Sequence, residues 1–419
     1  MKRTILLLIA LMVCLGANGQ KKGWSFEWKG MVNPHFYVDS REVIGGREDM
    51  MFFYPKPVVL DSAGNDINAH PSFNMLAITA RAGLKINAPD MLGAHVFGYI
   101  EGDFTGSKNS TINTLRLRHA YINMAWQHDE LLIGQYWYPM TIHEIMPGTS
   151  PLNMGAPFHP YARYNQVRYT RHFGHWELVG VAAFQLDNMS QGLNGASTEY
   201  ARNSCIPEFN LQLRYKNERL FVGIAGNLLT IKPRKTITDV FGNVTTTDKL
   251  LSTPSATAFV RYDWNNWTIK GQALVNDNLY EGCSMGGYME HYLEEAGTGK
   301  VNYNYLPWHY TTLWADFGRS TGHWRPGLFM GFGVNNDFGY KTLPVDKIYG
   351  RGYDLEYLYR IQPRITYSTN IGLSFTAEVE YTYAQYGKEA FDGAFNYYEH
   401  DNAGGVDHLR LMLDILFAF

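Results

Sequence analysis

The last residues of the chain, 409–419, read LRLMLDILFAF. Leucine, isoleucine or phenylalanine occupies every second position, and the final residue, Phe419, is itself aromatic. Because successive side chains of a β-strand point to opposite faces, this alternation predicts a strand with one continuous apolar face. The stretch therefore indicates a β-protein whose last strand reaches the end of the sequence.

The same two-residue period recurs along the chain. In 207–216 and in 357–368, apolar residues alternate with polar ones, so one face is apolar and the other polar. Sixteen such strands are predicted, at 24–38, 73–87, 91–104, 112–126, 129–138, 162–172, 175–187, 206–216, 219–231, 254–264, 266–276, 307–318, 322–335, 356–368, 370–386 and 405–419.

The connections between these strands alternate in length. Tight turns such as 88–90 and 217–218 alternate with longer segments, of which 39–72 and 276–306 are the longest. Only 18% of the residues are charged and 15% are aromatic, yet no apolar run after residue 20 is long enough for a membrane-spanning helix. These features predict an all-β fold, a 16-stranded antiparallel transmembrane barrel with short periplasmic turns and long extracellular loops.

The first residues are typical of a secretory signal. Lys2 and Arg3 precede an apolar run at 5–15, and the small residues Ala17 and Gly19 suit cleavage before residue 20. We expect a signal peptide at 1–19 and one barrel domain at 20–419; lipidation of Cys14 is the alternative. Loss of the two basic residues changes the formal net charge from −3 to −5, which predicts no nucleic-acid partner.

The C-terminal stretch resembles the assembly signal of bacterial outer-membrane proteins, a terminal phenylalanine preceded by apolar residues at alternate positions. The positions that match are Leu411, Leu413, Ile415, Phe417 and Phe419. This resemblance implies insertion into the Gram-negative outer membrane by its assembly machinery, with contacts to lipid and lipopolysaccharide.

Four further segments resemble the 16-stranded trimeric porins, especially the branch related to phosphate-selective and dicarboxylate-type porins. They are GYIEGDF at 98–104, LRLRHAY at 115–121, LIGQYW at 132–137 and RYNQVRY at 163–169. The signal ending in Gly-Gln resembles those of Bacteroidetes. The resemblance implies a homotrimer, a third loop folded into the pore, and passive diffusion of small hydrophilic solutes.

The segment 139–161 is the candidate for that third loop. It holds five of the 17 prolines of the chain, and proline stiffens a segment by restricting its backbone. Glu144 is its one carboxylate, so Glu144 with its neighbour His143 is predicted to form the acidic edge of a pore constriction. The alternative is an outer loop that caps the barrel without entering it.

A basic wall is expected opposite this segment. Its candidates are Arg81, Lys85, Arg116 and Arg118, although the apolar phase shifts after Leu117, which predicts a β-bulge near His119. Further pore-lining residues are predicted at Glu101, Asp103, Arg168, Arg214, Arg261, Arg364, Glu378 and Glu380. Charges on the polar faces nearly balance, which does not favour a dedicated anion channel. Each charge could instead pair with a cross-strand neighbour.

The sequence contains no enzyme or metal motif. It has no HExxH, G-x-S-x-G, Walker or CxxC pattern, so we predict no catalytic residue, metal or cofactor. A sugar- or dicarboxylate-selective channel, a surface receptor or adhesin, and an outer-membrane enzyme are the alternative functions. Cys205 and Cys283 could form a disulfide or remain free thiols. Most tryptophans fall near strand ends, where they are expected to form membrane-interface girdles.

Overall fold

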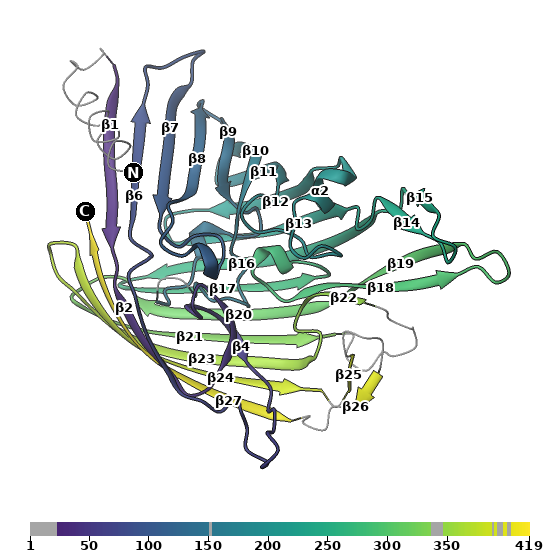
Figure 1. The fold of residues 1–419 in the computed structure, drawn as a ribbon. Coiled ribbons are helices and arrows are strands. Elements are labelled where there is room, and N and C mark those ends of the chain that lie inside the picture. Colours follow the sequence, from purple (N-terminus) through teal and green to yellow (C-terminus); the bar gives the residue numbers. More distant parts are fainter. Residues whose placement is uncertain (1–22, 151–152, 337–346, 388, 392–396, 400–403) are drawn as a thin grey trace, which may run out of the picture.

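The barrel wall is one antiparallel sheet made of eighteen strand segments. Two barrel strands are each interrupted, β1 with β2 and β5 with β6, so the segments form a closed barrel of 16 strands (Figure 1). This computed structural model describes residues 23–150, 153–336, 347–387, 389–391, 397–399 and 404–419. The predicted signal peptide, 1–19, lies outside the described residues.

All sixteen predicted strands are present. They are β1 (Ser25–Val32) with β2 (His35–Asp39), β5 (Ser72–Leu76) with β6 (Arg81–Asn87), β7 (His95–Asp103), β8 (Arg116–Ala125), β9 (Asp129–Trp137), β10 (Arg163–Phe173), β11 (Trp176–Phe184), β12 (Glu208–Lys216), β13 (Leu220–Ile231), β16 (Leu251–Trp264), β17 (Trp267–Asn276), β20 (Tyr310–Arg319), β21 (Trp324–Asn335), β23 (Leu355–Ser368), β24 (Leu373–Tyr386) and β27 (Gly405–Ala418).

The remaining elements lie in the long connections. They are β3 (Val43–Gly46), β4 (Met51–Pro55), η1 (Asn109–Thr111), η2 (His143–Ile145), α2 (Glu199–Ser204), β14 (Thr236–Thr238), β15 (Val244–Thr246), η3 (Tyr280–Gly282), β18 (Gly286–Glu294), β19 (Val301–Trp308), β22 (Lys347–Arg351), β25 (Glu389–Phe391) and β26 (Tyr397–Glu399). The hairpins β14–β15 and β18–β19 extend from the long-loop end (Figure 1). No helix among the described residues is long and apolar enough to cross a bilayer.

The barrel closes through its last strand. β27 pairs with β24 on one side and with β1 and β2 on the other. Pro34, which lacks an N–H, separates β1 from β2, and its carbonyl accepts a hydrogen bond from the Ile415 amide at 2.9 Å. The buried side chain of Asn33 also bonds to Asp414 at 2.7 Å. These contacts of Asn33 and Pro34 therefore hold the first barrel strand against β27 at the point where β1 and β2 are interrupted.

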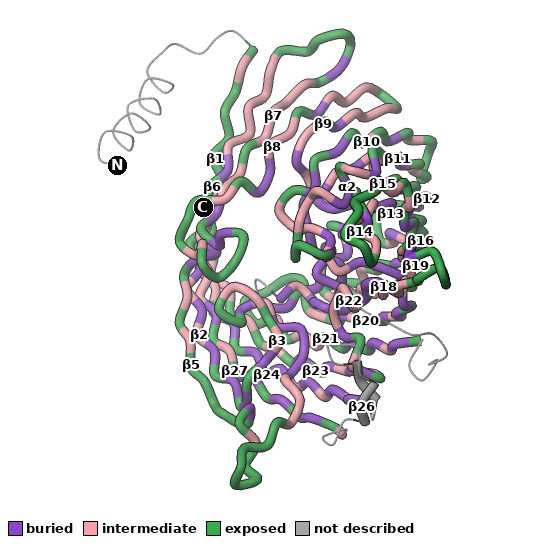
Figure 2. Tube along the Cα trace, turned by 45° about the vertical axis from the view of Figure 1, so that its right-hand side comes forward, coloured by how far each residue is buried: buried purple, intermediate pink, exposed green. Residues whose placement is uncertain are grey.

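The alternation predicted for the last strand is confirmed. Leu409 is 42% exposed and Leu411 is 49% exposed on the outer face, whereas Arg410 between them is fully buried inside. Figure 2 shows the same alternation of exposed and buried residues along the other strands. The apolar side chains that a soluble protein would bury thus cover the outside of this barrel.

The hydrophobic core lies inside the barrel, where the segment 139–161 and the hairpin β3–β4 meet the wall. Met140, Ile142 and Phe158 of the segment 139–161 are fully buried there. Trp137, Trp308 and Trp314 belong to this core, so the expected girdle position is wrong for these three tryptophans. Trp28, Trp264 and Trp324 are more than half exposed, as outward-facing rings should be.

Candidate functional site: a basic cavity beside the inserted segment

A bulge in β8 turns two arginines inward. Glu101 of β7 pairs with His119, whereas the next residue, Gly102, pairs with Leu117, so Arg118 is the extra residue of the bulged strand. The predicted bulge near His119 is therefore confirmed. It allows Arg118 to reach the inner face beside Arg116.

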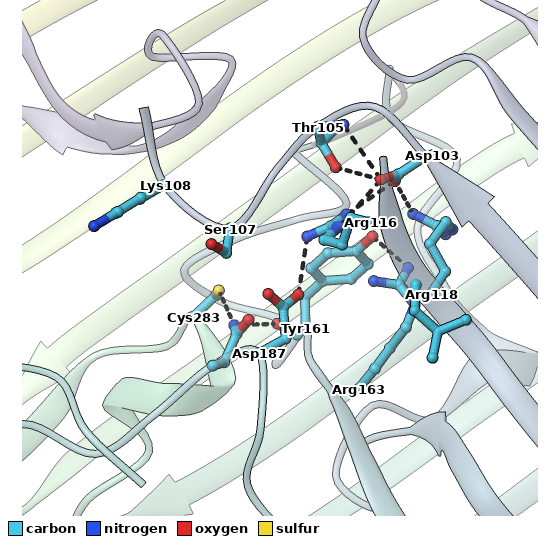
Figure 3. A network of polar contacts seen from close by, with 12 residues as sticks. Asp103, Thr105, Ser107, Lys108, Arg116, Arg118, Tyr161, Arg163, Asp187 and Cys283 are labelled. Carbon is cyan, nitrogen blue, oxygen red and sulfur yellow. Dashed lines mark hydrogen bonds and ion pairs between the residues drawn. The ribbon is translucent and has the colours of Figure 1, made fainter. Parts of the chain in front are cut away.

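These arginines form ion pairs with their cross-strand neighbours (Figure 3). Arg116 Nη2 lies 2.9 Å from Asp103 Oδ2, and Arg116 Nη1 lies 2.9 Å from Asp187 Oδ2. Arg118 Nη1 lies 2.8 Å from Asp103 Oδ2, and its Nε contacts Glu101. Two of the predicted pore-lining carboxylates thus hold two of the predicted basic residues in place.

Tyr161 and Arg163 belong to the same cluster, although neither was predicted as a site residue. The Tyr161 hydroxyl accepts a hydrogen bond from Arg163 Nη2 at 2.8 Å, and the Arg163 guanidinium lies 4.1 Å from the centre of the Trp137 ring. Arg163 stands at an odd position of β10, and odd positions further along this strand, such as Val167, face outward. Alternation alone therefore gave no signal for it.

Arginines surround the phenol of Tyr161. Burial raises the pKa of this group, but Arg163, Arg118, Arg116 and Arg81 outweigh burial and lower the pKa to about 8. Of the four basic residues predicted for the wall, three therefore meet around one ring. Lys85 does not join them, because its Nζ lies 3.5 Å from Glu27 nearer the short-turn end.

The segment 139–161 lies against the far wall of the barrel. Within it, Glu144 Oε1 lies 3.1 Å from Arg214 Nη1 of β12. The basic residues predicted opposite Glu144, namely Arg81, Arg116 and Arg118, surround Tyr161 instead. Burial raises the pKa of Glu144, but Arg214 and Arg168 outweigh burial and lower it. The ring of His143 is stacked 5.9 Å from that of Trp137. Glu144 and His143 therefore each have a partner from the wall, Arg214 of β12 and Trp137 of β9.

Backbone amides of this segment bind carboxylates of the wall. The amide of Gly148 bonds to Asp316 at 2.8 Å and that of Ser150 bonds to Glu378 at 3.0 Å. Asn153 donates to Glu380 at 2.8 Å. Glu378 and Glu380, predicted to line the pore, are 2% and 0% exposed beneath the segment, where they hold it in place.

Basic residues of the same wall bind backbone carbonyls of the segment or neighbouring carboxylates. Lys270 Nζ lies 2.7 Å from the Met146 carbonyl, and Arg360 Nη1 lies 2.7 Å from the Ala156 carbonyl. The predicted lining residues Arg261 and Arg364 pair with Asp263 at 3.0 Å and Asp316 at 2.7 Å. Most charges on this side of the barrel are therefore neutralised or covered by the segment.

A second inserted segment was not predicted. The hairpin β3–β4 also lies against the inner wall, since Arg360 donates to the Phe53 carbonyl at 3.0 Å, Arg410 donates to the Asp49 carbonyl at 2.8 Å, and Tyr386 donates to the Pro55 carbonyl at 2.6 Å. The alternation of strands predicts 39–72 only as a long loop, because its inward position depends on contacts with residues more than 300 positions away.

A cavity of about 590 Å³ lies between the two inserted segments and the wall. Five basic side chains line it, namely Arg47, Lys108, Arg116, Arg163 and Arg351. The carboxyl groups that line it are Asp187, which pairs with Arg116, and Glu281, whose pKa is raised well above its usual range by burial and by Glu208. The cavity therefore carries an excess of positive charge.

Neither a disulfide nor a metal cluster forms in the described part of the chain. Cys205 is an exposed thiol, whereas Cys283 is a buried one that lines the cavity and accepts a hydrogen bond from Asn188 at 2.9 Å. Within the described ranges, no three histidine, cysteine or acidic side chains come together as metal ligands.

Comparison with solved structures identifies outer-membrane channels of the same fold. The chain resembles the outer membrane channel DcaP of Acinetobacter baumannii with a TM-score of 0.67 and 14% identity, over 96% of this chain and 99% of that one. It resembles the anion-selective porin from Comamonas acidovorans (TM-score 0.53, 12% identity, 94% and 100% covered) and Salmonella typhi OmpF, solved with daunomycin (0.55, 11%, 95% and 98%). No protein-family model and no curated protein sequence matches the chain.

Proposed function

We propose that the chain forms a water-filled channel of the Gram-negative outer membrane through which small hydrophilic solutes diffuse passively. The closed barrel with an apolar outer face supports this role, as does the likeness in fold to outer-membrane channels. In this proposal the inserted segment 139–161 narrows the lumen, and solutes pass between it and the basic wall of β6, β8 and β10. The channel catalyses no reaction.

The proposed ion selectivity rests on the excess of basic side chains in the cavity. Arg47, Lys108, Arg163 and Arg351 form no ion pair with a carboxylate among the described residues. The near balance predicted for the strands does not apply to the cavity, because Arg47, Lys108, Arg163 and Arg351 are additional to those polar-face charges. The inserted segment covers charges of both signs, Glu378 and Glu380 as well as Arg360. The channel therefore favours anions over cations.

Targeting and assembly follow the same proposal. The signal at 1–19 is cleaved on export, the assembly machinery recognises the C-terminal strand, and the outer face contacts lipid and lipopolysaccharide. A homotrimer is the proposed assembly, since a structure of Vibrio cholerae OmpT with the same fold is described as a trimer.

Planar-bilayer recordings of the purified protein test this function. Stable open channels should appear, in steps of three for a trimer, and the reversal potential in a salt gradient should report anion preference. Lys108→Gln should reduce that preference, whereas Lys300→Gln, in the connection between β18 and β19, should not. A protein that inserts but stays silent would contradict the channel and favour an adhesin or enzyme.

A further inference from the structure

Two buried carboxyl groups lie where the inserted segment joins the long loops. Glu208, the first residue of β12, is 3% exposed, and Glu281 in η3 is 1% exposed. Glu208 Oε1 accepts hydrogen bonds from the Tyr138 hydroxyl at 2.7 Å and from Asn227 Nδ2 at 2.6 Å. Its second oxygen, Oε2, and the Oε1 atom of Glu281 have no hydrogen-bond partner among the described residues.

A third unpartnered oxygen lies in the same place. Tyr164 of β10 is fully buried, and its hydroxyl has no partner in the described part of the chain. The Tyr164 ring lies 4.6 Å from the ring of Tyr138, whose hydroxyl binds Glu208, and both carboxyl groups act electrostatically on Tyr164. Buried polar atoms usually have a hydrogen-bond partner, which can be a bound water or ion, so three neighbouring oxygens without a protein partner form a place where such a species can bind.

The surroundings do not neutralise the two carboxylates. Arg351 is the cation that acts on Glu281, but its guanidinium donates to backbone carbonyls of Tyr280 and Ser284, the latter at 2.9 Å. The side chain that hydrogen-bonds to Glu281 is the neutral Ser190, whose Oγ lies 3.5 Å from Glu281 Oε2. Two buried negative charges without a counter-charge are unstable, so the pair must take up protons or a cation.

All the side-chain atoms available as metal ligands here are oxygens, and this chemistry favours some cations over others. Carboxylates, hydroxyls and water suit a hard cation, and Ca²⁺ accepts irregular sets of such ligands more readily than Mg²⁺ does. Glu281 also lines the cavity, which provides a route for an ion from the solvent. We propose that Ca²⁺ binds between Glu208 and Glu281, with the hydroxyls of Tyr164 and Ser190 as neutral ligands.

Such an ion would brace the inserted segment. The Tyr161 amide donates to the Gly282 carbonyl at 2.6 Å, and Ser284 Oγ donates to the Pro157 carbonyl at 3.0 Å. Both contacts tie the return of the segment 139–161 to the stretch that carries Glu281. Calcium thus stabilises the segment that borders the channel, whether or not the channel prefers anions.

Equilibrium dialysis with radioactive calcium tests the site on the full-length protein, after treatment with a chelator in detergent. One ion should bind per chain. Glu281→Gln, Glu208→Gln and Tyr164→Phe should each weaken binding, the two glutamine variants by at least about tenfold. Glu199→Gln, a carboxylate in α2 at the same end of the barrel, is the matched control and should bind as the wild type does.

Thermal unfolding gives a second readout. Calcium should raise the unfolding midpoint of the wild type and of Glu199→Gln but not that of Glu281→Gln, because a ligand stabilises only the state that binds it. Absence of stoichiometric binding, or binding that survives in the Glu208→Gln/Glu281→Gln double variant, would overturn the inference and leave protons as the neutralising species. Channels without calcium binding would refute this site alone, and calcium binding without channels would refute the proposed function alone.

Discussion

The hydroxyl of Tyr161 accepts a hydrogen bond from Arg163 Nη2 at 2.8 Å, at the point where the inserted segment returns to the barrel wall. Arg116 and Arg118 reach the same ring from β8. Arg116 and Arg118 already pair with carboxylates, whereas Arg163 has no carboxylate partner among the described residues. A neutral phenol therefore leaves the charge of Arg163 to the solute path, and an ionised phenol cancels it. The protonation of Tyr161 therefore sets the charge of the proposed constriction.

Anion preference should consequently fall as the pH rises through about 8, the pKa of Tyr161. The phenol is neutral near pH 7 and ionised near pH 9, roughly one unit on either side of that pKa. Reversal potentials measured across this range should shift toward cations in the wild type and stay constant in Tyr161→Phe. Tyr367→Phe, on the outer face, should keep the wild-type shift. An equal shift in Tyr161→Phe would contradict the assignment.

The same pKa predicts a contribution to stability. Because the pKa of Tyr161 is lowered from 10.0 to about 8 in the folded state, ionisation favours folding. The stabilisation is complete above pH 10 and is lost as the pH falls through about 8. Thermal unfolding of the wild type and of Tyr161→Phe should therefore differ more at alkaline pH than at neutral pH. A difference that does not vary with pH would argue against this linkage.

Glu144→Gln should increase anion preference. The substitution removes the negative charge 3.1 Å from Arg214 Nη1, and the remaining carboxylate of Glu177 lies farther away, at 4.0 Å. One charge at a partly solvated position is expected to change the permeability ratio by about a factor of two. Reversal potentials in a salt gradient provide the measurement, with Glu199→Gln as the control. An unchanged potential would place Glu144 outside the solute path.

Removal of the β3–β4 hairpin should raise single-channel conductance. Replacing residues 43–55 with a short flexible linker takes away a segment that lies against the inner wall at Arg360 and Arg410. As a control, removal of the β14–β15 hairpin, 236–246, should leave conductance unchanged because this hairpin extends away from the barrel (Figure 1). Equal conductance after both deletions would mean that the inserted hairpin does not restrict the path.

Gly134→Ala should destabilise the barrel. Gly134 in β9 has a φ of +133°, and an added Cβ would lie 2.2 Å from the Ala120 carbonyl oxygen. Strain of this kind is expected to cost about 1–3 kcal/mol. Gly226→Ala is the matched control, since no heavy atom lies within 4 Å of its added Cβ. Thermal unfolding in detergent compares the two, and similar midpoints would show that β9 relaxes around the new methyl group.

The strands themselves followed from local properties of the sequence. Residues 409–419 and the other alternating segments contain enough information for element type and face, because a strand has a two-residue period and a barrel exposes its apolar face. The bulge near His119 was predictable for the same reason, since it shifts that period within one strand. Each of these features depends on neighbours only a few positions apart.

The composition of the site depends instead on distant parts of the chain. Periodicity placed Arg116 and Arg118 on the inner face, but the pairing of Glu144 with Arg214 and the burial of Glu378 by Ser150 join residues 70 and 228 positions apart. The inserted hairpin β3–β4 and the gathering of arginines around Tyr161 arise in the same way. Alternation determines which face of a strand a side chain occupies, whereas only the folded barrel determines which charges the inserted segments cover and which remain open to solutes.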